Sequence, residues 1–378
     1  MKAYIHSQIE LMIEQLETLV NIDSGSHDKE GIDRVGNLLQ DWFSELGYRI
    51  EVFDDEQYGN SFLLSYPDAT PDVLLLAHMD TVFAKGTVAA RPFGISGDRA
   101  YGPGVIDMKG SHISMLYALK ALLEHGGEQA VKHTQILFTS DEEIGAPSSR
   151  NIIERVAEGK KAVLVMEPAR KDGSLVTFRR GGGRFVLNIK GIAAHSGINP
   201  EEGSSAIEAL ARKTTELHAL SDHENGVSVN VGIISGGTTV NTVAEHAHAE
   251  IDLRISSAEQ GPVLTDQITA ICNKQSLDGT KATVTGGIGR PPMERNEKTV
   301  QLLTLIQQAG EEIGLQVTEV GTGGSSDASF TSAMGIPTID GMGPVGGGAH
   351  SSEEYLELPT LPERTHLLAE VLLRLAKK

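Results

Sequence analysis

The spacing of hydrophobic positions changes along the chain and predicts its elements. Residues 72–77, DVLLLA, form a short apolar run without a helix cap, which predicts a strand buried on both faces. Similar runs predict further strands over 49–54, 61–66, 134–139, 162–166, 315–320 and 336–340. Apolar residues three and four positions apart predict helices over 5–20, 29–46, 111–125, 297–313, 326–334 and 360–377. Strands that alternate with helices predict an α/β sheet, with a functional site at the carboxyl ends of its strands.

The pattern changes between about 180 and 289. Strands are predicted there over 184–189, 227–234 and 247–255, with helices over 203–220 and 259–275. This β-α-β-β-α order, with strands that look antiparallel, predicts an inserted α+β module. We therefore expect a main domain formed by 1–179 and 290–378, with the module 180–289 between its two parts. Residues 84–104, which contain glycine, proline and arginine, are predicted to form a long loop.

Composition and charge exclude several classes of function. The chain has 378 residues, 39% of them hydrophobic, so it has room for two globular domains. Its formal net charge is 32 − 51 = −19, which argues against nucleic acid or an anionic membrane as a partner. The single cysteine, Cys272, excludes an internal disulfide framework and a thiolate zinc site. The N-terminal stretch predicts an amphipathic helix instead of a signal peptide, so we expect a cytoplasmic protein.

Polar side chains follow several of the predicted strands. His78 and Asp80 end the first apolar run and, two residues apart, leave the sheet on the same side. The complete set of such side chains is His78, Asp80, Asp107, Glu142, Glu143, Glu167 and His350. Imidazoles and carboxylates without cysteine suit Zn²⁺ or a similar divalent ion. Because so many carboxylates at one edge would repel each other, two cations bridged by one carboxylate fit this set, as in dinuclear hydrolases.

Six sequence motifs together resemble those of the M20 metallopeptidases. They are HMDTV, GPGVIDMKG, SDEEIG, EPA, GIAAHSG and GGGAHS, and they extend over essentially the whole chain. Within the family the chain is most similar to the glutamate carboxypeptidase branch. The resemblance implies an α/β, zinc-exopeptidase-like catalytic domain with a mixed sheet and an inserted ferredoxin-like α+β domain that serves as lid and dimerisation domain. It also implies two divalent ions, with zinc as the expected metal and cobalt or manganese as alternatives.

The resemblance assigns a role to each strand-end side chain. Its metal ligands are His78 and Glu167 on one ion, Glu143 and His350 on the other, and Asp107 as the bridge. Asp80 is expected to hold the His78 imidazole from behind. Glu142 is expected to act as the general base that takes a proton from the metal-bridging water and passes it to the leaving nitrogen. The resemblance also predicts a cis peptide bond between Asp107 and Met108.

Further residues are expected to contact the substrate. The lid His195 is expected to reach the site of a neighbouring subunit and steady the oxyanion, which implies a homodimer through the lid domain. Asn241 is a second expected lid contact, and Arg290 is expected to bind the α-carboxylate of the substrate. Gly324 and Ser326, in a glycine-rich loop, are expected beside its C-terminal residue. The alternative for His195 and Asn241 is an ordinary loop position, and for Arg290 a linker charge.

These inferences predict a two-metal exopeptidase that cleaves an amide bond to a C-terminal amino acid with a free carboxylate, with glutamate as a candidate. The alternative is an N-acyl amino acid deacylase, like acetylornithine deacetylase or succinyl-diaminopimelate desuccinylase, or a di- or tripeptidase. Either enzyme takes a small substrate, a peptide or an N-acyl amino acid. A third hypothesis is a binding protein that kept the fold, but every expected ligand and the base are present.

Overall fold

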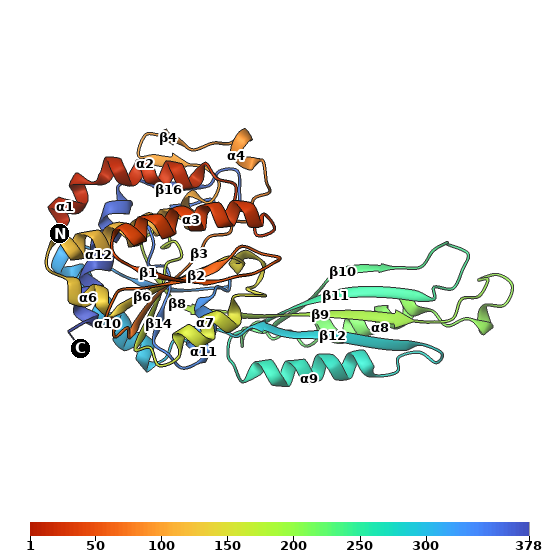
Figure 1. Ribbon diagram of the computed structural model, residues 1–378. Helices are drawn as coiled ribbons and strands as arrows, with labels where there is room; N and C mark the ends of the chain where they lie inside the picture. The colour runs from red at the N-terminus through yellow and green to blue at the C-terminus, as the bar shows by residue number, and fades with distance from the viewer. Residues whose placement is uncertain (378) are drawn as a thin grey trace. The chain divides into compact units, whose positions relative to one another are not determined.

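The computed structural model describes residues 1–377, which fold into two compact units (Figure 1). The larger unit consists of 1–178, 295–322 and the residues from 326 onward, and the smaller unit of 179–294 and 323–325. The smaller unit thus extends beyond the predicted module, to 294 instead of 289. The reason is local pairing, because Arg179 and Met293 exchange both backbone hydrogen bonds, each 3.0 Å long.

A mixed six-stranded sheet forms the centre of the larger unit. Its strands, in spatial order, are β1 (Arg49–Phe53), β2 (Ser61–Ser65), β6 (Thr134–Thr139), β3 (Val73–His78), β7 (Ala162–Val165) and β14 (Thr338–Ile339). The strands from β6 to β14 run parallel, whereas β1 and β2 are antiparallel to their neighbours. Every residue of β3 is buried, which confirms the interpretation of its apolar run.

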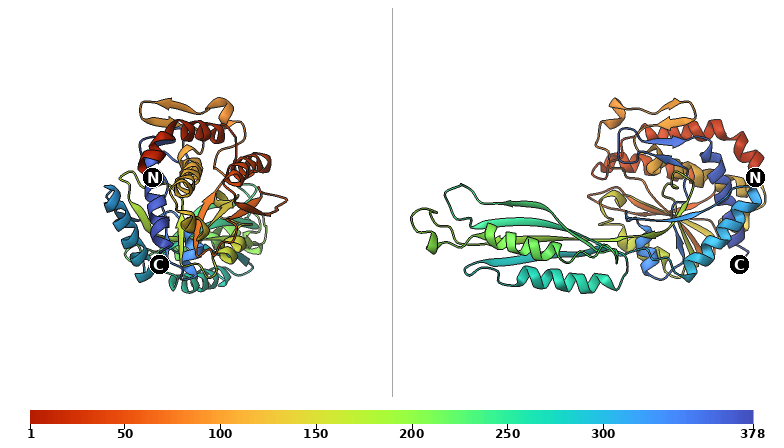
Figure 2. Two further views of the ribbon diagram at one scale, coloured as in Figure 1. Left: turned by 60° about the vertical axis from the view of Figure 1, so that its left-hand side comes forward. Right: turned by 180° about the vertical axis from the view of Figure 1, so that it is seen from behind.

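Helices cover both faces of this sheet (Figures 1 and 2). They are α1 (Lys2–Ser7), α2 (Ile9–Val20), α3 (Lys29–Glu45), α5 (Gly110–Glu124), α6 (Glu128–Lys132), α7 (Arg150–Ala157), α10 (Glu297–Ile313), α11 (Ala328–Ala333) and α12 (Thr360–Leu375). Helix α5 is buried along most of its length and packs against α12. Helix α10 begins as predicted, because the Asn296 side chain accepts a hydrogen bond from the Thr299 amide and caps its first turn. None of the described helices combines the length and hydrophobicity needed to cross a membrane.

The prediction of a long loop over 84–104 is wrong. This segment forms α4 (Thr87–Ala90), β4 (Gly94–Ser96) and β5 (Arg99–Tyr101). Strand β5 pairs with β16 (Tyr355–Glu357), which continues to β15 (Gly346–Gly347), and the four strands form a small antiparallel sheet. One partner of β5, β16, lies more than 250 residues away in the sequence. The other, β4, is adjacent, but its residues are all exposed, so neither strand shows the alternation that predicts a strand.

One predicted strand is displaced for a similar reason. The strand expected at 315–320 is β13 (Glu319–Thr322), which pairs with β8 (Leu175–Arg179) in a separate two-stranded sheet. The exposed or half-buried residues of β13 give it no continuous apolar run. Its position is therefore set by the strand with which it pairs.

The smaller unit has a ferredoxin-like topology. Its elements are β9 (Gly181–Lys190), α8 (Ala206–His218), β10 (Ser228–Gly236), β11 (His246–Ile255), α9 (Gln260–Asn273) and β12 (Lys281–Arg290). The sheet order is β10-β11-β9-β12, and all neighbours are antiparallel. Alternate residues of β9 and β11 form a separate hydrophobic core with α8 and α9. The sequence pattern missed β12, whose glycines and mostly exposed residues lack a buried alternation.

Candidate metal centre

The parallel strands of the central sheet bring the predicted ligands to one edge. Strand β3 pairs with both β6 and β7, so the carboxyl ends of the three strands lie side by side. His78 is the last residue of β3, Glu142 and Glu143 lie in a short helical turn after β6, and Glu167 follows β7. Two loops complete the set, with Asp107 in the turn η1 (Val105–Lys109) and His350 in the loop before β16.

His78 is buried and faces two carboxylates with one ring nitrogen. Its Nε2 lies 3.1 Å from Asp107 Oδ1 and 3.6 Å from Glu167 Oε1. Its Nδ1 lies 2.9 Å from the main-chain carbonyl oxygen of Asp80, the position for donation of the Nδ1 proton. This contact directs Nε2 toward the carboxylates, which is the orientation that a metal ligand needs.

Asp107 lies between two imidazoles. While its Oδ1 faces His78, its Oδ2 lies 3.2 Å from His350 Nε2, and the same His350 nitrogen lies 3.2 Å from Glu143 Oε2. The peptide bond from Asp107 to Met108 is cis, as the resemblance predicted. A carboxylate with each oxygen directed at a different imidazole has the arrangement of a bridging ligand.

The electrostatics of the cluster follow from its density of charge. Burial and the nearby Asp107 carboxylate raise the pKa of Glu167 to about 7. Burial also opposes ionisation of Asp107, but hydrogen bonds from His350 and His78 outweigh it and lower its pKa. Hydrogen bonds to Asp107 and Glu143 raise the pKa of His350 to about 10. A buried cluster with so many carboxylates favours the binding of cationic groups.

Two further observations indicate that this set of imidazole and carboxylate side chains could bind divalent ions. Ligand atoms of His78, Asp107 and Glu143 lie within 4.8 Å of one another, and so do those of His78, Glu142 and Glu167. Glu143 Oε1 is buried and has no hydrogen-bond partner among the described residues. An unsatisfied buried carboxylate oxygen is costly unless a cation or another donor meets it. Imidazole and carboxylate ligands are those that zinc and similar metals take.

The position of Asp80 differs in one respect from the prediction. Its carboxylate lies 3.4 Å from His78 Nδ1, so the main-chain carbonyl of Asp80 is the closer partner of the imidazole. The fully buried carboxylate accepts hydrogen bonds from Ser26 Oγ at 2.6 Å, from the Glu142 amide at 3.1 Å and from the Glu143 amide at 3.2 Å. Asp80 therefore holds the backbone of the two adjacent glutamates.

Two buried residues behind the cluster were missed in the sequence. His112, in α5, contacts the main-chain oxygen of His78 through Nε2 at 2.7 Å, and burial lowers the pKa of its imidazole to about 3. Glu354, four residues after His350, accepts hydrogen bonds from the backbone of the turn that carries Asp107. Neither carried a strong signal, although the position of Glu354 three residues after the GGGAHS motif could have drawn attention to it.

The smaller unit brings two of the predicted lid residues together. His195 and Thr242 form an antiparallel bridge, and the Ser196 amide donates to the main-chain oxygen of Asn241 at 3.0 Å. His195 and Asn241 are both exposed, and the His195 ring accepts a hydrogen bond from the Gly197 amide. These neighbouring loops thus present an imidazole and an amide side by side.

Three predicted substrate contacts have different surroundings. Arg290 is half-buried at the end of β12. The main-chain oxygen of Gly324 accepts a hydrogen bond from Arg179 Nη1 at 3.1 Å. Ser326 is buried and its hydroxyl donates to Asp340 Oδ2 at 2.6 Å. The predicted substrate contact of Ser326 therefore finds no support in the position of its side chain, which stabilises the loop instead.

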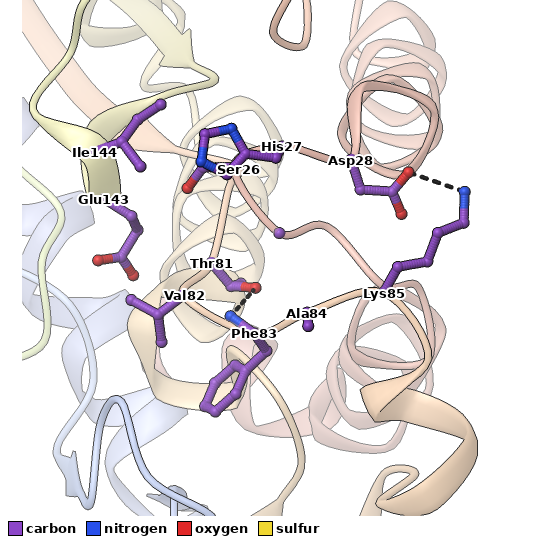
Figure 3. Close-up of a pocket in the computed structure, with 11 residues that line it drawn as sticks. Ser26, His27, Asp28, Thr81, Val82, Phe83, Ala84, Lys85, Glu143 and Ile144 are labelled. Carbon is purple, nitrogen blue, oxygen red and sulfur yellow. Dashed lines mark hydrogen bonds and ion pairs between the residues drawn. The ribbon is translucent and has the colours of Figure 1, made fainter. Parts of the chain in front are cut away.

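A pocket of about 600 Å³ adjoins the candidate ligands (Figure 3). Loops 25–28 and 81–85 form its walls, together with Glu143 and Ile144. Figure 3 shows the Glu143 carboxylate on the side opposite the ion pair of Lys85 with Asp28, in which Lys85 Nζ lies 3.1 Å from Asp28 Oδ1. Val82 and Ile144 are partly exposed, so the pocket has an apolar surface beside a carboxylate.

Comparison with known proteins identifies the family. The family model described as peptidase family M20/M25/M40 matches residues 74–374. The chain is 30% identical to carboxypeptidase G2 of Pseudomonas sp. (strain RS-16) over 377 residues, which cover 96% of this chain and 89% of the relative.

Solved structures share the fold. Aminopeptidase PepT of Bacillus cereus superposes with a TM-score of 0.79 at 22% identity and covers 98% of this chain and 99% of its own. The YXEP protein of Bacillus subtilis, described as a dinuclear metal-binding peptidase, superposes with a TM-score of 0.70 at 16% identity, covering 99% of each chain. The sequence motifs, the ligand cluster and the family match agree, and the chain belongs to peptidase family M20/M25/M40, whose members are metal-dependent hydrolases.

Proposed function

We propose that this protein is a two-metal exopeptidase that removes a C-terminal amino acid with a free α-carboxylate, glutamate being the first candidate. The observation that carries the proposal is the meeting of five imidazole and carboxylate ligands at one sheet edge, with Asp107 between His78 and His350. The similarity to carboxypeptidase G2 supports the carboxypeptidase activity.

Each ligand then has a defined task. His78 and Glu167 would hold one divalent ion, Glu143 and His350 would hold the other, and Asp107, which faces both imidazoles, would serve both ions. When bound, such a pair of ions supplies Lewis-acid activation of the scissile carbonyl and of a water molecule. Zinc is the expected metal because two imidazoles and three carboxylates suit it.

Glu142 is the proposed general base. It is buried beside the ligand cluster, and its amide is held 3.1 Å from Asp80 Oδ1. In this position the Glu142 carboxylate would accept a proton from the attacking water and deliver it to the leaving nitrogen. The adjacent Glu143 serves as a ligand because successive side chains in the turn point in different directions.

The substrate would lie against both the ligand cluster and the pocket. The pocket offers an apolar surface next to Glu143, which suits the acyl part of the substrate. The roles proposed for Arg290 on the α-carboxylate, and for His195 and Asn241 at the reacting carbonyl, rest on their sequence motifs. The homodimer through the smaller unit and the cytoplasmic location also stay predictions.

A substrate panel tests the proposal. Purified protein loaded with zinc, cobalt or manganese is assayed on folyl- and peptidyl-glutamates beside N-acetylornithine, N-succinyl-diaminopimelate and di- and tripeptides. We expect the highest kcat/KM with an acyl-glutamate. Faster turnover of an N-acetyl or N-succinyl substrate would instead indicate a deacylase. Faster turnover of a short peptide with a free amino terminus would indicate a di- or tripeptidase.

A further inference from the structure

Glu354 is a fully buried carboxylate whose partners are all backbone amides. Its Oε2 accepts a hydrogen bond from the Gly104 amide at 3.0 Å. Its Oε1 accepts two more, from the Ile106 amide at 3.0 Å and from the Asp107 amide at 3.1 Å. Burial of a carboxylate is unfavourable, and three N–H groups of one tight turn offset this cost in part, although burial still raises the pKa of Glu354 to about 7.

These three amides belong to the turn η1, which carries Asp107, and to Gly104, the residue before it. Gly104 has a φ of +74°, a left-handed conformation that brings its amide and the following ones toward the same point. A Cβ at Gly104 would come within 2.7 Å of Thr81, so the turn is also tightly packed. The hydrogen bonds to Glu354 therefore constrain the backbone up to and including Asp107.

The same loop carries both Glu354 and His350. His350 has a φ of +65°, and Gly348, two residues earlier, has a φ of +68°, so this loop is sharply bent. Its beginning places His350 Nε2 at 3.2 Å from Asp107 Oδ2, and its end places Glu354 against the Asp107 amide. One short segment thus contacts Asp107 from two sides, through the side chain and through the main chain.

We propose that Glu354 is a positioning residue of the metal centre, which holds the Asp107 turn so that the two carboxylate oxygens of Asp107 face His78 and His350. The inference rests on the proposed role of Asp107 as bridging ligand. It goes beyond the ligand set because the hydrogen bonds of the Glu354 carboxylate among the described residues go to backbone amides and to no proposed ligand side chain. Glu354 therefore acts on the position of Asp107 through the backbone of the turn.

The chain offers a matched control one residue away. Glu353 is exposed, and among the described residues its carboxylate accepts a hydrogen bond only from the neighbouring Ser352 hydroxyl, at 3.4 Å. Glu354→Gln and Glu353→Gln remove the same charge from adjacent positions. Only Glu354→Gln turns an amide NH₂ toward backbone N–H groups, and at least one of the three must then lose its acceptor.

Metal affinity is the decisive measurement, made by competition of the metal-free proteins with a chromophoric chelator for zinc. We expect Glu354→Gln to bind at least one ion about 10–100-fold more weakly, as observed when the outer partners of metal ligands are changed. Glu353→Gln should stay within about twofold of the unmodified protein. Equal affinities for the two variants would overturn the proposal, even if Glu354→Gln also had a lower melting temperature.

Hydrogen exchange of the unmodified, metal-free protein gives a second test that does not depend on the folding of a variant. The amides of Gly104, Ile106 and Asp107 should exchange at least a hundredfold more slowly than that of Gly97, in the exposed turn between β4 and β5. Exchange of the three amides at the rate of Gly97 would overturn the proposal. Because neither test needs substrate, both are independent of the proposed peptidase specificity.

Discussion

Replacement of Asp80 by asparagine tests how this residue holds Glu142, the proposed base, and Glu143, a proposed ligand. The change conserves shape but leaves one oxygen where the carboxylate had two. In the best orientation, one of the two amides of Glu142 and Glu143 faces an NH₂ group and loses its acceptor. An unsatisfied buried donor costs about 1–3 kcal/mol, and the remaining bonds weaken because they no longer end on a charge. We expect a total loss of about 2–4 kcal/mol in the free energy of unfolding of the zinc-loaded protein.

The structure also predicts that the Asp80→Asn substitution lowers the catalytic rate more than it disturbs His78. The main-chain carbonyl of Asp80, which the substitution leaves in place, still meets His78 Nδ1 at 2.9 Å. The turn with Glu142 and Glu143 loses its anchor. Displacement of a general base by about 1 Å can cost about a hundredfold in rate. We therefore expect kcat to fall about a hundredfold, with a smaller change in KM.

The assays are urea unfolding of the zinc-loaded protein, zinc content after gel filtration, and steady-state kinetics on an acyl-glutamate. Ser26→Ala is a graded control, because it removes one hydrogen bond to Asp80 and keeps the charge. Asp222→Asn is a second control, because Asp222 lies in the smaller unit and accepts hydrogen bonds from the backbone amide and the side chain of Asn225. The reasoning would be refuted if the Asp80→Asn variant had the same urea unfolding midpoint and the same kcat as the control variants.

Three further predictions concern the base, the ions and the thiol. Glu142→Ala should lower kcat by about 10²–10⁴-fold with metal content near two per chain; full activity would exclude Glu142 as the base. Removal of the ions with a chelator should lower the free energy of unfolding by about 2.7 kcal/mol for each ion lost, relative to protein in zinc at 100 times the dissociation constant of each site. An unfolding midpoint that does not change when zinc is added or removed would argue against the proposed metal site. Burial raises the pKa of Cys272 to about 11, so at pH 8 a disulfide reagent should label it only after unfolding, and rapid labelling of the folded protein would contradict its burial.

Much of the larger unit followed from local sequence. The DVLLLA run, the spacing in α5 and the Asn296 cap of α10 each depend on residues close together in the chain. The proposed metal ligands came from the same source, because each stands directly after an apolar strand or in a glycine-bearing motif. The resemblance then supplied the predictions that spacing alone left open, namely which carboxylate would bridge the ions and which would act as base.

The elements that the sequence missed lack a local signal. Strand β5 is defined by pairing with β16, and β12 by pairing with β9, so their exposed residues resemble loops. Ser326 is a comparable case at the level of a side chain. Its motif indicated a substrate contact, but folding directs its hydroxyl to Asp340.

The sequence by itself determined the family, the two-unit organisation around an inserted module, and the ligand types, because periodicity and motifs are properties of neighbouring residues. Only the tertiary structure decided how the ligands are held. Asp80 binds amides 62 and 63 residues away, and Glu354 binds a turn about 250 residues away. Such contacts form only in the folded structure, because folding of the sheet brings residues together that are far apart in the sequence. Short-range patterns therefore identify the ligands, whereas long-range hydrogen bonds set their geometry.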